Sequence, residues 1–192
     1  FLYNTYEYND RKLIESYIDN KNKCIVIGGG LGFIATISYH LSQNKIIVFE
    51  INKSINELLY KNLIYNKVDF ELIDKNLVIT LDNDNLNYYY ETDNFLETSL
   101  FSKTNKKNII KSITTNDVTK FNDFNTLIID AEGIEHHYIT NLDKVSNVKY
   151  IFFELHYNIL SEKEINEIFK ALEKNSFVKI SKCFNSFFYQ KN

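Results

Sequence analysis

A run of glycines between a short apolar segment and a helical pattern constrains the fold of this chain most. The apolar segment is Cys24–Ile27, and four of the next five residues, Gly28–Gly32, are glycine. The apolar run predicts a buried strand, and the following pattern predicts a helix over 31–43. Glycine lacks a Cβ, so the backbone can turn sharply here and approach a ligand, while the first N–H groups of the helix remain available. The segment therefore predicts a turn that holds a nucleotide-like ligand.

A carboxylate ends the next predicted strand. Glu50 stands 18 positions after Gly32 and 22 positions after Gly28. An acid at about this distance from a glycine turn can accept hydrogen bonds from both hydroxyls of a ribose. We therefore expect Gly28, Gly30, Gly32 and Glu50 to bind one ligand together.

Strands and helices alternate along most of the chain. The predicted strands are 23–27, 45–50, 68–73, 125–130, 148–155, 177–181 and 184–189, and the predicted helices between them are 31–43, 54–65, 132–142 and 161–174. This order predicts an α/β fold with a doubly wound, mostly parallel seven-stranded sheet and helices on both faces. The last two strands predict a C-terminal antiparallel hairpin that turns near 182–183.

Two segments stand outside this alternation. In the N-terminal segment 1–22, apolar spacing predicts a helix over Asn9–Asp19, capped by Asn9 or Asp10 and packed on the sheet edge. The insertion at about 75–113 holds two alternating runs, 77–81 and 86–91, which predict a hairpin, and its length is typical of a lid that faces substrate. With 192 residues, 44% of them hydrophobic, the chain predicts a single domain over 1–192.

Charge and cysteine content exclude several classes of partner and metal site. A net charge of −3 provides no broad basic field, so we expect no nucleic acid partner. Cys24 and Cys183 are the only cysteines, and neither has the spacing of a zinc site. We expect a reduced, cytoplasmic protein. No apolar run approaches the roughly 18 residues that span a bilayer, so no membrane association is expected.

The remaining polar candidates follow the predicted strands directly. Since ligands of open α/β sheets bind beyond the carboxyl ends of the strands, residues at these ends should face one crevice. Besides the glycines and Glu50, they are Asp74, Asp130 with Glu132, and Glu154 with His156.

Two ligand classes compete for the glycine turn. Gly30, Gly32 and Ala35 loosely satisfy the dinucleotide pattern, whereas Gly28, Gly30 and Gly32 satisfy the G-x-G-x-G pattern of S-adenosylmethionine sites. A dehydrogenase normally needs a second half-fold or a substrate domain, for which 192 residues leave little room. The terminal hairpin also fits a methyltransferase sheet better.

Five blocks, in order along the chain, resemble the FkbM family of class I methyltransferases. They are Val26–Gly32, Val48–Asn52, Asn62 with Asn66, Ile128–Glu135 and Phe153–His156. The most specific of them is Asp130-x-Glu132-Gly133-x-Glu135. The resemblance implies methyl transfer from S-adenosylmethionine to a small-molecule or glycan hydroxyl, as on a sugar or a secondary metabolite. The family usually has an acid at the position of Val26, where it would contact the methionine end of the cofactor.

The resemblance also suggests roles for the strand-end residues. Ile51 would lie against the adenine, and Asp74 would accept from the adenine amino group or simply belong to a turn. Asp130 would orient or deprotonate the acceptor hydroxyl, or offset the sulfonium charge, and it also suits a helix cap. His156 would act as a base or position the acceptor. Glu132 completes the predicted catalytic set.

Metal binding and other functions stay open at this point. Asp130, Glu132, Glu154 and His156 are residue types that hold divalent ions, but their spacing does not require one, so no metal is predicted. His136 and His137 are adjacent and cannot form an i, i+4 ligand pair. The alternatives are an NAD(P)- or nucleotide-sugar-binding enzyme and a catalytically inert module of the same fold.

Overall fold

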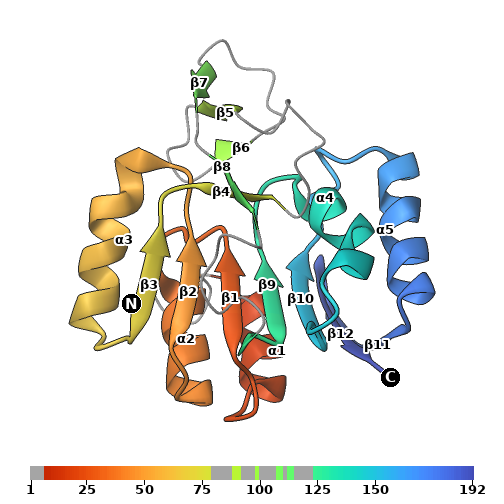
Figure 1. Ribbon diagram of the computed structural model, residues 1–192, viewed down its shortest axis with the longest axis horizontal. Coiled ribbons are helices and arrows are strands. Elements are labelled where there is room, and N and C mark those ends of the chain that lie inside the picture. Colours follow the sequence, from red (N-terminus) through yellow and green to blue (C-terminus); the bar gives the residue numbers. More distant parts are fainter. Residues whose placement is uncertain (1–6, 79–87, 92–97, 100–106, 110–111, 115–122) are drawn as a thin grey trace.

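The computed structural model describes residues 7–78, 88–91, 98–99, 107–109, 112–114 and 123–192. Seven strands form one sheet in the order β11-β12-β10-β9-β1-β2-β3 (Figure 1). They are β1 (Cys24–Ile27), β2 (Ile46–Phe49), β3 (Phe70–Ile73), β9 (Thr126–Ile129), β10 (Tyr150–Glu154), β11 (Phe177–Cys183) and β12 (Ser186–Lys191). The helices are α1 (Tyr8–Tyr17), α2 (Phe33–Ser42), α3 (Lys53–Tyr65), α4 (Glu135–Thr140) and α5 (Glu162–Lys174).

The pairing of these strands confirms the predicted doubly wound, mostly parallel sheet. Neighbours from β3 to β10 pair in parallel, and β12 pairs antiparallel with both β10 and β11. The C-terminal hairpin is confirmed too, but its turn is at 184–185 rather than 182–183. Lys182 and Cys183 still pair across the hairpin, and Phe184 takes the left-handed backbone of the turn with φ 52°.

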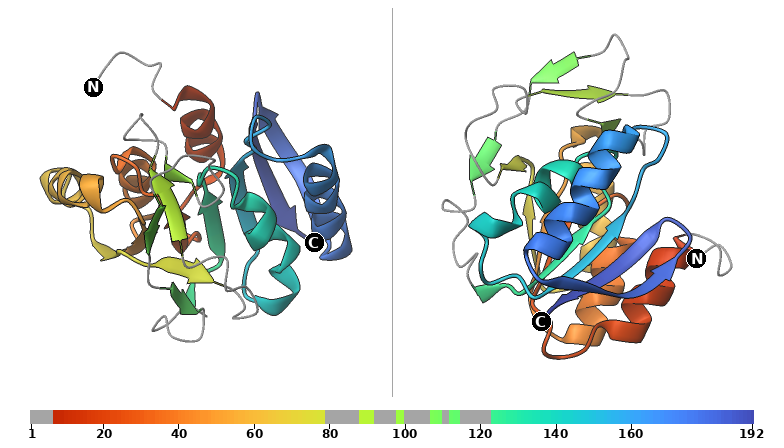
Figure 2. Two further views of the ribbon diagram at one scale, coloured as in Figure 1. Left: turned by 90° about the horizontal axis from the view of Figure 1, so that it is seen from above. Right: turned by 90° about the vertical axis from the view of Figure 1, so that its right-hand side faces the viewer.

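Helices cover both faces of the sheet (Figure 2). Because side chains alternate along a strand, β1 sends Cys24 and Val26 toward α1, α2 and α3, and Ile25 and Ile27 toward α4 and α5. All four side chains are buried. The sheet is therefore the middle of three layers, and its central strands β1, β2 and β9 are buried along their whole length.

The first helix differs from its prediction in bounds and cap. It covers Tyr8–Tyr17, and Glu7 stands at its N-cap without a capping side-chain hydrogen bond, so neither Asn9 nor Asp10 is the cap. Leu13 and Ile14 are buried against the sheet face formed by β10 and β12 and against α2. The helix does contact the edge strand β11, as predicted, and it extends beyond this edge over the face formed by β10 and β12.

The segment between β3 and β9 pairs differently from the predicted hairpin. The strand β4 (Asn76–Val78) pairs in parallel with β8 (Ser112–Thr114). The strand β5 (Tyr88–Glu91) pairs with β6 (Thr98–Ser99) and β7 (Lys107–Ile109). The runs 77–81 and 86–91 are thus not partners of each other where they are described, and 79–87 lie outside the described residues. The described strands lie beyond the carboxyl ends of the parallel sheet (Figure 1), where a lid was expected.

The helix predicted at 132–142 is shorter in the structure, because α4 begins at Glu135. Glu132 therefore lies in the turn before this helix.

None of the helices in the described part of the chain is both long and apolar enough to cross a membrane.

Candidate active site

The glycine turn is pressed against the end of β9. The N–H groups of Gly28 and Gly29 both donate to the carbonyl of Phe49, at 3.0 and 3.1 Å. Gly28 has φ 86°, and a Cβ built on it would lie 1.7 Å from the carbonyl oxygen of Asp130. Position 28 therefore admits only glycine, and the turn and Asp130 are brought together as the sequence predicted.

The helix α3 holds the turn from the other side. The side-chain amide of Asn62 donates to the carbonyl of Leu31 at 2.9 Å. Asn52 caps α3 by accepting from the N–H of Ser54 at 3.0 Å. Asn62 thus ties α3 to the glycine turn, and Asn52 fixes the start of the same helix.

Glu50 is directed into the glycine turn. Its side chain accepts from the N–H of Gly30 at 2.9 Å and from the N–H of Asn52 at 2.7 Å. The residue is only 6% exposed, and this burial raises the pKa of its carboxyl, against the opposing effect of the backbone hydrogen bonds. Backbone N–H groups of Gly29 and Ile51 also favour its charged form, and a carboxylate has about four acceptor positions on its two oxygens, which a ribose hydroxyl can share with these groups.

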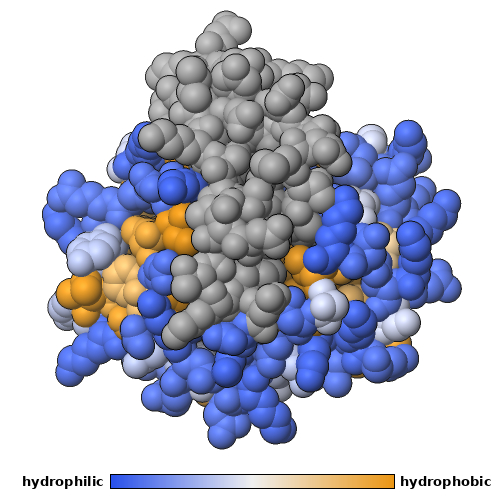
Figure 3. Space-filling view, in the orientation of Figure 1, coloured by the Kyte–Doolittle hydropathy of each residue, from blue (hydrophilic) through white to orange (hydrophobic). Residues whose placement is uncertain are grey.

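Asp74 lies apart from the glycine turn, on the outer side of the sheet. It is exposed, follows β3, and lines an open groove of about 550 Å³ together with Asn56 and Tyr60. Hydrophobic residues gather on this side of the molecule, over α3 and β3 (Figure 3). Ile51, beside Glu50, is partly buried against the core. The strand ends of Glu50 and Asp74 are adjacent, since the N–H of Glu50 donates to the carbonyl of residue 73.

Four carboxylates surround His156 at the ends of β9 and β10. Its Nδ1 lies 2.5 Å from Oε1 of Glu135, which also accepts from the backbone N–H of His156 at 3.1 Å. Its Nε2 lies 3.5 Å from Oε1 of Glu132, 3.8 Å from Oδ1 of Asp130 and 3.9 Å from Oε2 of Glu154. The three predicted catalytic residues are therefore brought together, and the predicted strand-end acid Glu154 joins them.

The cluster changes the protonation of its members. Burial lowers the pKa of His156, but the hydrogen bond to Glu135 and the charges of its neighbours raise it more, to about 9. Burial, and then the negative charges of Asp10 and Glu154, hold the pKa of Asp130 well above its usual range. At neutral pH His156 is an imidazolium, so its Nε2 has no lone pair with which to accept a proton.

Sequence reasoning missed Asp10 as a site residue. It lines a cavity of about 10 Å³ together with Ile34 and Asp130, and burial and the charge of Glu154 raise its pKa to about 6. A signal was present, because Asp10 stands three positions before Leu13, on the face of α1 that is buried. An acid on the apolar face of a helix indicates a functional-site residue more strongly than it indicates a helix cap.

Glu135 was part of the most specific block, but its contact with His156 could not be predicted. Its side chain is wholly buried and reaches from the first residue of α4 to the end of β10. Burying a carboxylate is costly unless it is paired, so the imidazolium of His156 stabilises the buried carboxylate of Glu135. In return, Glu135 fixes the orientation of the imidazole ring through Nδ1.

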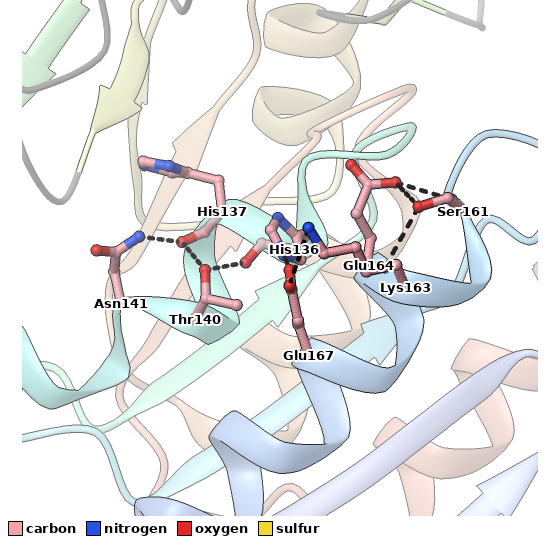
Figure 4. A network of polar contacts seen from close by, with 8 residues as sticks. All are labelled: His136, His137, Thr140, Asn141, Ser161, Lys163, Glu164 and Glu167. Carbon is pink, nitrogen blue, oxygen red and sulfur yellow. Dashed lines mark hydrogen bonds and ion pairs between the residues drawn. The ribbon is translucent and has the colours of Figure 1, made fainter.

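The two adjacent histidines of α4 point in different directions, as their spacing predicted (Figure 4). His136 points to α5, where its Nε2 lies 2.8 Å from Oε2 of Glu167. His137 is buried, and burial, followed by the charges of His136 and Lys144, lowers its pKa to about 4. They fix α4, and with it Glu135, without forming a ligand pair.

The charge of His156 predicts how stability depends on pH. Its pKa is raised from 6.5 to about 9 on folding, so the stabilisation is complete below pH 6.5 and is lost as the pH rises through 9. We expect the free energy of unfolding to fall by on the order of 2 kcal/mol over this range. Urea denaturation at several pH values, in EDTA, should show the fall in the wild type and not in His156→Gln. Parallel pH profiles would contradict the assignment.

Known structures share this fold, although no protein-family model matches the chain. No curated protein matches it either. An uncharacterized protein from Listeria monocytogenes serotype 4b superimposes with a TM-score of 0.57 at 10% identity, over 95% of this chain and 66% of that one, just under two thirds. Precorrin-6y C5,15-methyltransferase from Geobacter metallireducens gives 0.57 at 13% identity, over 97% and 87%. Ribosomal protein L11 methylase from Lactobacillus delbrueckii subsp. bulgaricus gives 0.55 at 15% identity, over 95% and 77%.

The structural matches show which fold this chain has. The chain has the Rossmann-like fold of class I S-adenosylmethionine-dependent methyltransferases, as predicted. The matched structures give no specific support for the FkbM family. An rRNA methylase is also among them, so they do not support the expected absence of a nucleic acid acceptor.

Proposed function

We propose that this protein is an S-adenosylmethionine-dependent methyltransferase. The observation that carries the proposal is the cluster of acidic side chains beside the glycine turn. Asp10, Asp130, Glu132 and Glu154 gather there around one imidazole, that of His156. Burial raises the pKa of Asp10 and Asp130, and a cation bound beside them would favour their charged forms. S-adenosylmethionine carries two cationic groups, a sulfonium and an ammonium, and suits such a cluster. The pyrophosphate of a dinucleotide or a nucleotide sugar would be repelled by it.

The cofactor would extend from the glycine turn toward β9. Gly28, Gly30 and Gly32 would contact its methionine and ribose portions, and Glu50 would accept from the ribose hydroxyls. Ile51 would lie against the adenine. Asp74 would accept from the adenine amino group if the ligand reaches the outer groove that Asp74 lines.

The methyl group would be transferred by in-line displacement. The acceptor oxygen forms a bond to the methyl carbon while the bond between this carbon and sulfur breaks. The electron pair of the broken C–S bond stays on sulfur, which becomes the neutral thioether of S-adenosylhomocysteine. The hydroxyl proton passes to Asp130 in its ionised form, which the sulfonium beside it favours, and the raised pKa of this carboxyl makes that form a better base than an ordinary carboxylate. His156, held by Glu135, positions Asp130 and Glu132. The contribution of the enzyme is mainly alignment, because the sulfonium is already reactive.

Two arguments favour a hydroxyl of a small molecule or glycan as the methyl acceptor. The resemblance to the FkbM family favours a hydroxyl on a sugar, a glycan precursor or a secondary metabolite. The net charge of −3 also disfavours an acceptor bound through many phosphates. An acceptor panel should nevertheless include tRNA and rRNA fragments, because an rRNA methylase shares the fold.

Calorimetry with three ligands tests the function. We expect saturable binding of S-adenosylmethionine and S-adenosylhomocysteine and none of NAD(H). Binding of NAD(H), with no response to either sulfur ligand, would overturn the proposal. Binding of the sulfur ligands without transfer to any acceptor of the panel would favour an inert module of the same fold.

Asp10 should affect affinity and stability in opposite directions. Val26 lies on the same side of the sheet as α1, and Asp10 lines a cavity with Ile34 and Asp130, so we propose that Asp10 supplies the acid that position 26 lacks. In Asp10→Asn we expect roughly tenfold weaker binding of S-adenosylmethionine, and a smaller loss for S-adenosylhomocysteine, which has no sulfonium. The pKa of Asp10 is raised from 3.8 to about 6, so its charge is a cost above pH 6. The variant should therefore be more stable at pH 7, by up to about 3 kcal/mol.

Glu15 provides the matched control for this variant. It lies on the exposed side of α1 and pairs with Arg11. Glu15→Gln should change neither property, and equal changes in both variants would show that Asp10 acts only through the helix.

A further inference from the structure

Three side chains at the ends of β9 and β10 offer ligand atoms to a single point. One carboxylate oxygen each from Asp130 and Glu154 and a ring nitrogen of His156 all lie within 4.8 Å of one another. Two ligands of an ion that binds at roughly 2.1 Å lie at most about 4.2 Å apart. Small rotations of the two carboxylates are enough to reach that spacing, because both are partly exposed.

The imidazole is oriented as in a metal site. Its Nδ1 is held at 2.5 Å by Glu135, whose side chain is wholly buried, and this leaves Nε2 directed at the carboxylates. Metal-ligating histidines are commonly fixed by a carboxylate on the second nitrogen in this way. The side chain of His156 is itself only 10% exposed, so its direction is set by packing as well as by Glu135.

The distances around Nε2 suit shared ligation better than hydrogen bonding. Its nearest carboxylate oxygen, on Glu132, lies at 3.5 Å, and those of Asp130 and Glu154 lie at 3.8 and 3.9 Å. An N–H···O bond is about 2.7–3.2 Å long. Four carboxylates around one ring also leave an excess of negative charge, which a divalent ion would offset and a single proton would not.

We propose that Asp130, Glu154 and His156 bind a divalent cation at the ends of β9 and β10, with Glu132 beside it. The set mixes carboxylate oxygens with one imidazole nitrogen, and Mn²⁺ is a suitable probe because it accepts both types of ligand. The ion would replace the proton on Nε2. Its binding does not depend on the cofactor, whereas its use, to hold the acceptor oxygen beside the methyl group, rests on the proposed function.

Electron paramagnetic resonance of Mn²⁺ tests the site directly. The full chain is freed of metal with EDTA, exchanged into metal-free buffer and titrated with Mn²⁺, and free ion is read from its signal. We expect one saturable site per chain in the wild type and at least tenfold weaker binding in Glu154→Gln and His156→Gln. His136→Gln is the matched control, since this histidine also pairs with a carboxylate but points to α5 (Figure 4), and its variant should bind as the wild type does.

Several results would overturn the inference. They are the absence of saturable Mn²⁺ binding in the wild type, and equal binding by the wild type and both site variants. If His156→Gln fails to fold by circular dichroism, Glu154→Gln carries the test, because its side chain is 31% exposed and its change is isosteric. Calorimetry with S-adenosylhomocysteine in EDTA separates the two proposals. Cofactor binding without Mn²⁺ binding refutes only the metal site, and Mn²⁺ binding without cofactor binding refutes only the methyltransferase.

Discussion

Gly28→Ala is expected to cost at least about 3 kcal/mol of folding free energy and to abolish cofactor binding. The added Cβ would lie 1.7 Å from the carbonyl oxygen of Asp130, and a backbone atom cannot rotate away as a side chain can. The φ of 86° adds strain of its own. Either the glycine turn or the end of β9 must move, and both belong to the site. Urea denaturation and calorimetry with S-adenosylhomocysteine measure the two losses.

Gly30→Ala is the matched control, two residues along the same turn. Gly30 also has a positive φ, of 49°, but a Cβ there would meet no atom within 4 Å among the described residues. We expect a loss of only about 1 kcal/mol, from the backbone conformation alone. A Gly28→Ala protein as stable as Gly30→Ala would mean that the turn does not lie against β9.

Local signals explain why most of the sheet could be predicted. Each central strand is a short apolar run next to a turn signal, and Ile46–Phe49 or Thr126–Ile129 reads as a buried strand without any knowledge of its neighbours. Parallel order then follows from alternation with helices. The glycine turn, Glu50 and the acids after β9 and β10 meet for the same reason, since parallel strands end at one edge of the sheet.

Pairings between distant segments could not be predicted in this way. The strands β4 and β8 are more than 30 residues apart, and nothing in an alternating run specifies its partner, so the nearer run was chosen wrongly. The contact of Glu135 with His156 depends on where the first turn of α4 docks on β10. Asp10 enters the site because α1 covers a sheet face. All three depend on packing between elements, whereas the sequence pattern describes each element alone.

Glu50→Gln should weaken the binding of S-adenosylhomocysteine by about 100-fold, because charge-assisted hydrogen bonds contribute about 1.5–3 kcal/mol each. The carboxylate now accepts from Gly30 and Asn52 and has acceptor positions that the ribose can share. A glutamine of the same shape has one acceptor oxygen, so its NH₂ group would face either a backbone N–H or a ribose hydroxyl. Stability should change by less, since the loss of these bonds is partly offset by removing a buried charge whose pKa is raised.

Comparing the two measurements decides what Glu50 does. Glu71→Gln is the control, because this acid lies on the neighbouring strand β3, is exposed and pairs only weakly with Lys45 at 3.2 Å. It should bind the ligand as the wild type does. If Glu50→Gln lost stability but kept its affinity, Glu50 would serve only to hold the glycine turn, and the ribose would have to be bound elsewhere. A large loss of affinity in a protein of near-normal stability would instead place the ribose at the end of β2, where the spacing of the glycines and Glu50 first predicted it.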